Sequence, residues 1–115
     1  DGLNYQIGSN GKFIKTNKIN KNIPFVFGDF KNIEFLKLKE IIENLNFNYK
    51  NIKNFYYFNS NRWDIEMNNG ILIKLPSKKV DEALKLVQIF LSEENLKNIK
   101  IIDARIKNQV IINEQ

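Results

Sequence analysis

The chain has 115 residues, with 18 Lys and Arg against 13 Asp and Glu, and it contains neither His nor Cys. This length predicts a single domain. The two missing residue types exclude disulfides, thiol chemistry, imidazole bases and the zinc sites that depend on them. Enzymatic chemistry would therefore depend on carboxylates, Lys, Tyr or Ser, and we expect no cofactor and no metal.

The first twenty residues predict a hairpin followed by a basic loop. Apolar residues alternate from Leu3 to Ile7, and after a break at residues 8–11 they resume at Phe13. A glycine-rich phosphate loop is the alternative, but it would lead into a helix, whereas residues 12–16 are strand-like. The basic loop contains four lysines and no acid: Lys12, Lys15, Lys18 and Lys21. A solvated loop is the simpler interpretation, and binding of nucleic acid or anionic lipid is the alternative.

The next segments predict a strand, a helix and an aromatic strand. Residues 25–27 are apolar and end at a glycine, and a helical period runs from Asp29, a candidate N-cap, to Leu45. Its apolar stripe is Phe35, Leu38, Ile41, Ile42 and Leu45, with Lys37, Lys39, Glu40 and Glu43 largely on other faces. The aromatic run in residues 52–58 predicts a buried strand rather than a ligand cage.

Residues 63–75 predict the clearest hairpin of the chain. A two-residue turn at Asn69-Gly70 would place Glu66 opposite Ile73, on the face that carries the apolar side chains. A three-residue loop, residues 68–70, instead pairs residue 65 with 73 and puts all apolar side chains on one face. We therefore predict the longer loop, because burying Glu66 without a partner costs about 1–3 kcal/mol.

The remaining chain predicts a second helix and two more strands. Pro76 ends the preceding strand, Ser77 is placed to cap a helix, and an apolar helical stripe runs from Val80 to Leu91. Two strand-like runs follow, at residues 99–106 and 109–113. The fold class is therefore α+β, with a mostly antiparallel sheet built from hairpins and two helices packed on one face. The expected core includes Trp63, Ile65, Met67, Ile71, Ile73, Leu84 and Val87.

Three features have both a functional and a structural interpretation. Asp64, Glu66 and Asp103 could form a carboxylate site for general acid/base work, although alternation points Asp64 and Glu66 to solvent beside arginines that would neutralise them. Asp103 and Arg105 share one strand face, which fits either a structural salt bridge or a charged recognition surface. Trp63 fits a core position, and the alternative is a shallow groove with its indole N–H free for a partner.

The last strand-like run is the strongest indication of binding. Gln109 to Asn113 is apolar on both faces and has no Pro and no internal charge. An edge strand without such features is a template for another strand. Pattern alone leaves open whether this strand lies at an edge or inside the sheet.

An ordered set of motifs resembles the end of the extracytoplasmic domain of the FtsQ/DivIB cell-division family. The motifs are Arg62-Trp63-Asp64-Ile65, Asn69-Gly70-Ile71, Leu75-Pro76, Ala83-Leu84 and Ile102-Asp103-Ala104-Arg105. The resemblance covers residues 24–113. It implies a non-enzymatic scaffold of the division machinery, at the outer face of the bacterial inner membrane. Residues 1–115 would be its β domain, a fragment without the membrane anchor and the polypeptide-transport-associated domain.

The resemblance also implies a partner and a site. In the family, the last strand receives a segment of FtsB, part of an FtsB/FtsL pair, as an added strand. Carried over by position, the expected partner-binding residues are Arg62, Arg105, Ile106, Asn108, Gln109, Val110, Ile111 and Ile112. The second arginine before the tryptophan is Asn61 here, and Ile106 replaces a side chain that is often aromatic. Because arginine pairs bidentately with carboxylates, we expect acidic residues in the partner. We expect no nucleic acid, because such a site needs a basic face interleaved with aromatics or Arg, and Arg62 and Arg105 are the only arginines.

Overall fold

The computed structural model describes residues 5–7, 13–15, 23–93 and 98–114 as one mixed sheet with two helices. The strands lie in the order β2-β1-β3-β4-β5-β6-β7-β8 across the sheet. The elements are β1 (Tyr5–Ile7), β2 (Phe13–Lys15), β3 (Phe25–Phe27), α1 (Asn32–Asn44), the 3₁₀ turn η1 (Tyr49–Asn51), β4 (Ile52–Phe58), β5 (Arg62–Met67), β6 (Leu72–Lys74), α2 (Val80–Glu93), β7 (Ile99–Asp103) and β8 (Ile111–Glu114).

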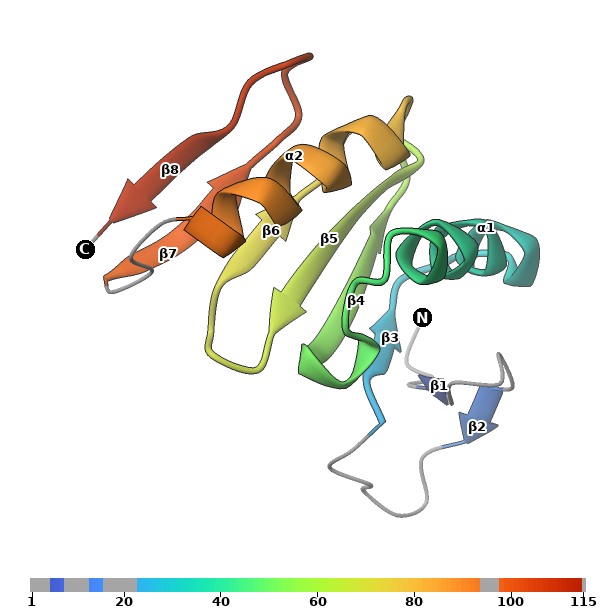
Figure 1. Ribbon diagram of the computed structural model, residues 1–115. Helices are drawn as coiled ribbons and strands as arrows, with labels where there is room; N and C mark the ends of the chain where they lie inside the picture. Colours follow the sequence, from blue (N-terminus) through green and yellow to red (C-terminus); the bar gives the residue numbers. More distant parts are fainter. Residues whose placement is uncertain (1–4, 8–12, 16–22, 94–97, 115) are drawn as a thin grey trace.

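Both helices cover the same face of the sheet (Figure 1). The pairs β3–β4 and β6–β7 are parallel, and α1 and α2 form their crossovers, whereas the other pairs are antiparallel. The strands β3 and β6 run in the same direction and both crossovers step the same way, so right-handed connections place both helices on one side. The predicted α+β class is confirmed, while the two parallel pairs were not predicted.

One row of side chains crosses the sheet under the helices. The register pairs Val26 with Phe55, and then continues to Ile65, Ile73 and Ile102 on successive strands. All five side chains are 0% exposed. The sixth member, Ile112 on β8, pairs with Ile102 but is 39% exposed. We call this set the central row, and only its last member lies beyond the cover of the two helices (Figure 1).

The hairpin of β5 and β6 has the predicted three-residue loop. Ile65 pairs with Ile73, and Met67 N–H donates to Ile71 O at 2.8 Å. Gly70 has φ of +92°, the left-handed conformation that such a loop requires. All six apolar side chains of the hairpin are buried: Trp63, Ile65, Met67, Ile71, Ile73 and Leu75.

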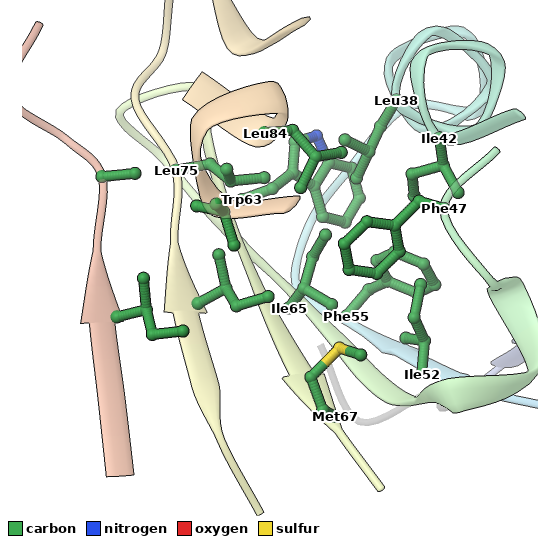
Figure 2. Close-up of a cluster of buried hydrophobic side chains, with 14 of the residues drawn as sticks. Leu38, Ile42, Phe47, Ile52, Phe55, Trp63, Ile65, Met67, Leu75 and Leu84 are labelled. Atoms are coloured by element: carbon green, nitrogen blue, oxygen red, sulfur yellow. The ribbon is translucent and has the colours of Figure 1, made fainter. Parts of the chain in front are cut away.

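Trp63 is at the centre of an aromatic cluster between the sheet and the helices (Figure 2). Its ring lies 5.7 Å from Phe35 and 4.8 Å from Tyr57, measured between centroids. Trp63 is 6% exposed, and Leu84 and Val87 of α2 are fully buried beside the same core. The aromatic surface that these residues remove from water is a large share of what holds the helices on the sheet.

Both helices begin later than the sequence predicts. Asp29 is not the N-cap of α1, because Lys31 occupies that position and its N–H donates to Glu34 Oε1 at 3.1 Å. Ser77 does not cap α2, because the helix starts at Val80 after Lys79 with φ of +55°. Lys39 was expected largely outside the apolar stripe of α1, but it is 7% exposed and pairs with Glu43 at 2.6 Å. A long aliphatic stem allows this burial.

The N-terminal hairpin is confirmed in its backbone pairing, with Tyr5 opposite Lys15 and Ile7 opposite Phe13. Its turn at residues 8–12 and most of the basic loop, with Lys12, Lys18 and Lys21, lie outside the described residues. At the end of β3, Gly28 has φ of +113°, and a Cβ there would lie 2.5 Å from Tyr57 O. Glycine thus lets the chain pass close to β4 before it enters α1.

Candidate functional site

The last strand lies at one end of the sheet order. β8 pairs with β7 only, so within the described residues its outer edge faces no other strand. The strand begins at Ile111, two residues later than predicted, because Asn108 has φ of +62° and Gln109 N–H closes a turn on Ile106 O at 3.1 Å. Asn108, Gln109 and Val110 therefore belong to the connection from β7 and not to the strand.

The expected binding residues bring exposed apolar side chains to this edge. Ile106 is 53% exposed, Ile111 44% and Ile112 39%. Ile112 lies on the helix-covered face, in the central row, whereas Ile111 pairs with Asp103 on the open face of the sheet. Partly exposed isoleucines on both faces of one edge strand are typical of a surface that a partner covers.

A pocket of about 270 Å³ adjoins the connection between β7 and β8. It lies between the connection that follows β7 and the first turns of α2, with Ala104 and Ile106 on one side and Ala83 and Leu86 on the other. Four basic side chains and one acid also line it: Lys78, Lys79, Arg105, Lys107 and Glu82. The pocket combines apolar walls with a basic rim, a combination suited to an apolar side chain next to a carboxylate.

Arg105 is held in place by its neighbour on β7. Its Nε donates to Asp103 Oδ1 at 2.9 Å and its Nη2 to Asp103 Oδ2 at 2.6 Å. The guanidinium lowers the pKa of Asp103, chiefly through these hydrogen bonds. The predicted salt bridge is therefore present. Because a guanidinium has five N–H donors, the 45% exposed Arg105 side chain keeps donors for a partner.

Arg62 is fixed more firmly than Arg105. Its Nη1 donates to Asp64 Oδ1 at 2.7 Å and to Leu75 O at 3.1 Å, and its guanidinium carbon lies 4.9 Å from the Phe58 ring centroid. The side chain is 18% exposed. These contacts tie β5 to the residue before Pro76, so Arg62 fixes the start of the turn that forms one wall of the pocket.

Asp64 does not point to solvent, contrary to the prediction from alternation. It is 4% exposed because Arg62 covers it on the open face of the sheet. Burial raises the pKa of Asp64, while the nearby Arg62, Lys74 and Arg105 oppose that shift. Asp64 is therefore a buried ion-pair partner and not an accessible carboxylate.

The other two carboxylates are also held separately. Glu66 accepts hydrogen bonds from Tyr56 at 2.6 Å and from Asn54 at 2.8 Å, and the bond from Tyr56 is the main cause of its lowered pKa. Asp103 is held by Arg105. None of the three carboxylates lines the pocket beside Ile106 or a second pocket between the helices. In the described part of the chain, no group of three acidic residues is placed to hold a metal ion.

Sequence reasoning missed the turn before α2. Pro76 and Ser77 were interpreted only as a strand stop and a cap, but residues 76–79 form a wall of the pocket beside Ile106. The signal was the pair Lys78-Lys79 directly before an apolar helix. The stacked rings of Phe25, Phe27 and Tyr56 on the open face were missed as well, although their alternation with Val26 and Phe55 places them there.

A sequence model of the "Cell division protein FtsQ/DivIB, C-terminal" family matches residues 1–105 of this chain. The chain belongs to the FtsQ/DivIB family. Curated relatives named "Cell division protein FtsQ" come from Rickettsia conorii, Rickettsia bellii and Rickettsia felis, each 42% identical over 53 residues. The alignment covers 44% of this chain and 20% of each relative. The chain thus matches a fifth of the length of these relatives.

The family match ends before the edge strand. It includes Arg62 and Arg105, whereas Ile106 and β8 lie beyond residue 105. A role for β8 in this FtsQ/DivIB domain therefore depends on its position in the sheet and on its exposed side chains. Neither helix in the described ranges is long and apolar enough to cross a membrane.

Proposed function

We propose that this chain is a non-enzymatic binding module of the division machinery, which takes up a strand from a partner along β8. The observation that carries the proposal is the position of β8 at the sheet edge, with Ile111 and Ile112 exposed on its two faces. The partner is an FtsB/FtsL-type division protein. The full-length protein is anchored in the inner membrane with this domain on its outer side, where co-localisation with the partner strengthens weak contacts.

Every second residue of β8 directs its backbone N–H and C=O groups away from β7, toward a partner. Ala104 N–H donates to Lys74 O at 2.9 Å, so Ala104 and Ile102 direct their backbone groups to β6. The intervening residue, Asp103, then faces β8, where it pairs with Ile111. By the same alternation the N–H and C=O groups of Ile112 point away from β7. These groups would form the first hydrogen bonds with an added strand.

Side chains next to β8 would select the partner sequence. An added strand places alternate residues over the helix-covered face, beside Ile112, and over the open face, beside Ile111. The pocket next to Ile106 would accept an apolar side chain of the partner. Its basic rim, which includes Arg105 and Lys107, would favour acidic residues in the same segment. Arg62 contributes by fixing the turn before α2, and Arg105 by direct contact.

Hydrogen exchange with a peptide from the C-terminal part of an FtsB-type partner tests the mechanism at single amides. The Ile111 N–H is already bonded to β7 and is expected to change little. The Ile112 N–H is unprotected in the free chain, and its exchange is expected to slow at least tenfold when the peptide binds. Protection only on α1 or at β2, or binding without any slowing at Ile112, would contradict strand addition.

A proline substitution in β8 distinguishes the loss of an added partner strand from the loss of β8 itself. Ile112→Pro removes an outward N–H and leaves the bonds to β7 in place, so we expect it to abolish peptide binding with little loss of thermal stability. Ile112→Thr is the matched control, because it keeps the N–H and the β-branched shape. It is expected to weaken binding by about fivefold or less. If Ile112→Pro binds as well as the unmodified chain, strand addition at β8 is wrong.

A further inference from the structure

A second pocket opens between the two helices, on the other side of α2 from β8. Its volume is about 430 Å³. Leu38 and Ile41 of α1 and Val80 of α2 supply apolar walls, and Trp63 of β5 also lines the pocket. We call this pocket the interhelical cleft. It is larger than the pocket beside Ile106 and shares with it only the turn residues Ser77 and Lys79.

The cleft is lined by residues along one face of α1 and by the first turn of α2. The crossovers make the two helices run in the same direction, and near their C-terminal ends Gln88 Nε2 donates to Leu45 O at 2.8 Å. The lining residues of α1 run from Glu34 to Ile41, and those of α2 are Val80 and Asp81 in its first turn. The N-terminus of α2, where backbone N–H groups lack helical partners, therefore lies at the cleft.

Trp63 presents an unused donor to this cleft. Among the described residues, no acceptor receives a hydrogen bond from its indole N–H, although the side chain is only 6% exposed. No described side-chain N or O atom is both fully buried and unpaired, so this nitrogen keeps some accessible surface, and Trp63 lines the cleft. Figure 2 shows the nitrogen turned toward the space between Leu38 and Leu84, on the two helices. A buried indole N–H usually has a partner.

The charges around the cleft favour an acceptor-bearing occupant. Lys37 and Lys79 line the cleft, and neither forms an ion pair within the described ranges. Glu34 is already engaged by the Tyr57 hydroxyl at 2.7 Å and by the Lys31 N–H at 3.1 Å. Asp81 lies in the first turn of α2, where it offsets the positive end of that helix. The two lysines and the indole remain as free donors.

We propose that the interhelical cleft binds a partner segment that carries a carboxylate next to an aliphatic side chain. The carboxylate accepts hydrogen bonds from the Trp63 indole and from Lys37 or Lys79, while the aliphatic side chain packs on Leu38 and Val80. The Asp81 carboxylate can accept a backbone N–H group that flanks such a residue, which favours a peptide over a free carboxylic acid. This site lies away from β8, so it would hold a different segment from the added strand.

The single tryptophan of the chain makes the test specific. We would titrate the ¹⁵N-labelled chain with acetyl-Leu-Asp-Leu-amide and with acetyl-Leu-Asn-Leu-amide, and follow the indole cross-peak of Trp63. The acidic peptide is expected to move this cross-peak in a saturable way, and the amide peptide to bind several-fold more weakly. Acetate alone should cause no saturable change. If the acidic peptide leaves the indole signal unmoved at millimolar concentration, or if both peptides act equally, the proposal is wrong.

Matched variants separate the cleft from the neighbouring pocket. Lys37→Gln and Lys79→Asn are each expected to weaken binding of the acidic peptide about two- to fivefold, and asparagine tolerates the positive φ of residue 79. Lys78→Gln is the control, because Lys78 lines only the pocket beside Ile106. Ile112→Pro should bind this peptide normally, which keeps the result independent of strand addition. An equal loss in Lys78→Gln would assign the effect to net charge and overturn the site.

Discussion

The middle of the central row and its end at β8 differ in their cover and not in their chemistry. Ile73 in the middle of the sheet is fully buried, whereas Ile112 on β8 is 39% exposed, although both are isoleucines on the same face. The helices lie over the strands from β3 to β7, and none of the described elements lies over β8 (Figure 1). The alternation of residues along a strand thus determines which face of the sheet a side chain occupies. Only the packing of the helices determines whether that side chain is buried.

The same contrast holds for the two Arg-Asp pairs on the open face. Each pair joins residues two positions apart in the chain, Arg62 with Asp64 on β5 and Arg105 with Asp103 at the end of β7. The Arg62 side chain is 18% exposed and the Arg105 side chain 45% exposed. The Arg62–Asp64 pair at the centre of the sheet is shielded from solvent and contributes to stability. The Arg105–Asp103 pair, next to the edge strand, is more accessible.

The largest expected effect compares the two isoleucines directly. Ile73→Ala should lower the free energy of unfolding by about 2–5 kcal/mol, because it leaves a cavity in a fully packed row. Ile112→Ala removes the same atoms from a site that is already partly exposed to solvent. It should lower the free energy of unfolding by less than about 1 kcal/mol. Urea unfolding monitored by circular dichroism measures both. Equal losses would mean that β8 is covered as well as β6.

The next effect compares the two arginines. Arg62→Met should destabilise the chain by about 2–3 kcal/mol, because Asp64 then stays buried without its cation. Arg105→Met should change the unfolding midpoint very little, since both members of that pair are closer to solvent. The double variant Arg62→Met with Asp64→Leu is the control, and it should recover most of the loss. A midpoint that is unchanged in Arg62→Met would contradict a stabilising role for this pair.

The smallest effect concerns the acid side of the pH profile. The folded pKa of Asp103 is lowered, so its contribution is present above its unfolded pKa of about 3.9 and is lost as the pH falls through the folded value. The folded pKa of Asp64 is raised, so protonation there favours the folded state. Asp103→Asn should therefore reduce the loss of unfolding free energy between about pH 5 and pH 3, because it removes the group that is protonated there. Asp64→Asn should increase that loss, because it removes a group whose protonation favours the folded state. Urea midpoints at several pH values measure the slopes, and slopes that change in the same direction would refute the contrast.

Patterns within single elements were enough to predict much of the fold. The period of two in residues 63–75 and the cost of burying Glu66 gave the register of the β5–β6 hairpin. The helical stripes gave both helices, but not their starts, because Lys31 and Lys79 occupy cap positions that no propensity favours. The parallel pairs were missed because they join strands separated by a whole helix, and no local period records which strands become neighbours.

The candidate site was predictable only in part. The sequence predicted a last strand without proline or internal charge, and only the topology of the sheet places it at the edge. Alternation failed for Asp64, since it predicts the face of a side chain but not that Arg62 folds over it. Trp63 was expected in the core, and it is there, yet it also lines the interhelical cleft. A side chain as large as tryptophan can belong to a core and to a site at once.

The two crossovers also have a consequence for the order of folding. The β5–β6 hairpin closes through a three-residue loop, whereas each parallel pair must wait until an entire helix has formed and docked. Hairpins form in about 1–10 μs, and pairings between distant residues are slower because loop closure must come first. We therefore expect β5 and β6 to form an early nucleus, with β3 and β7 joining it from opposite sides. Because β8 pairs only with β7, it would join last.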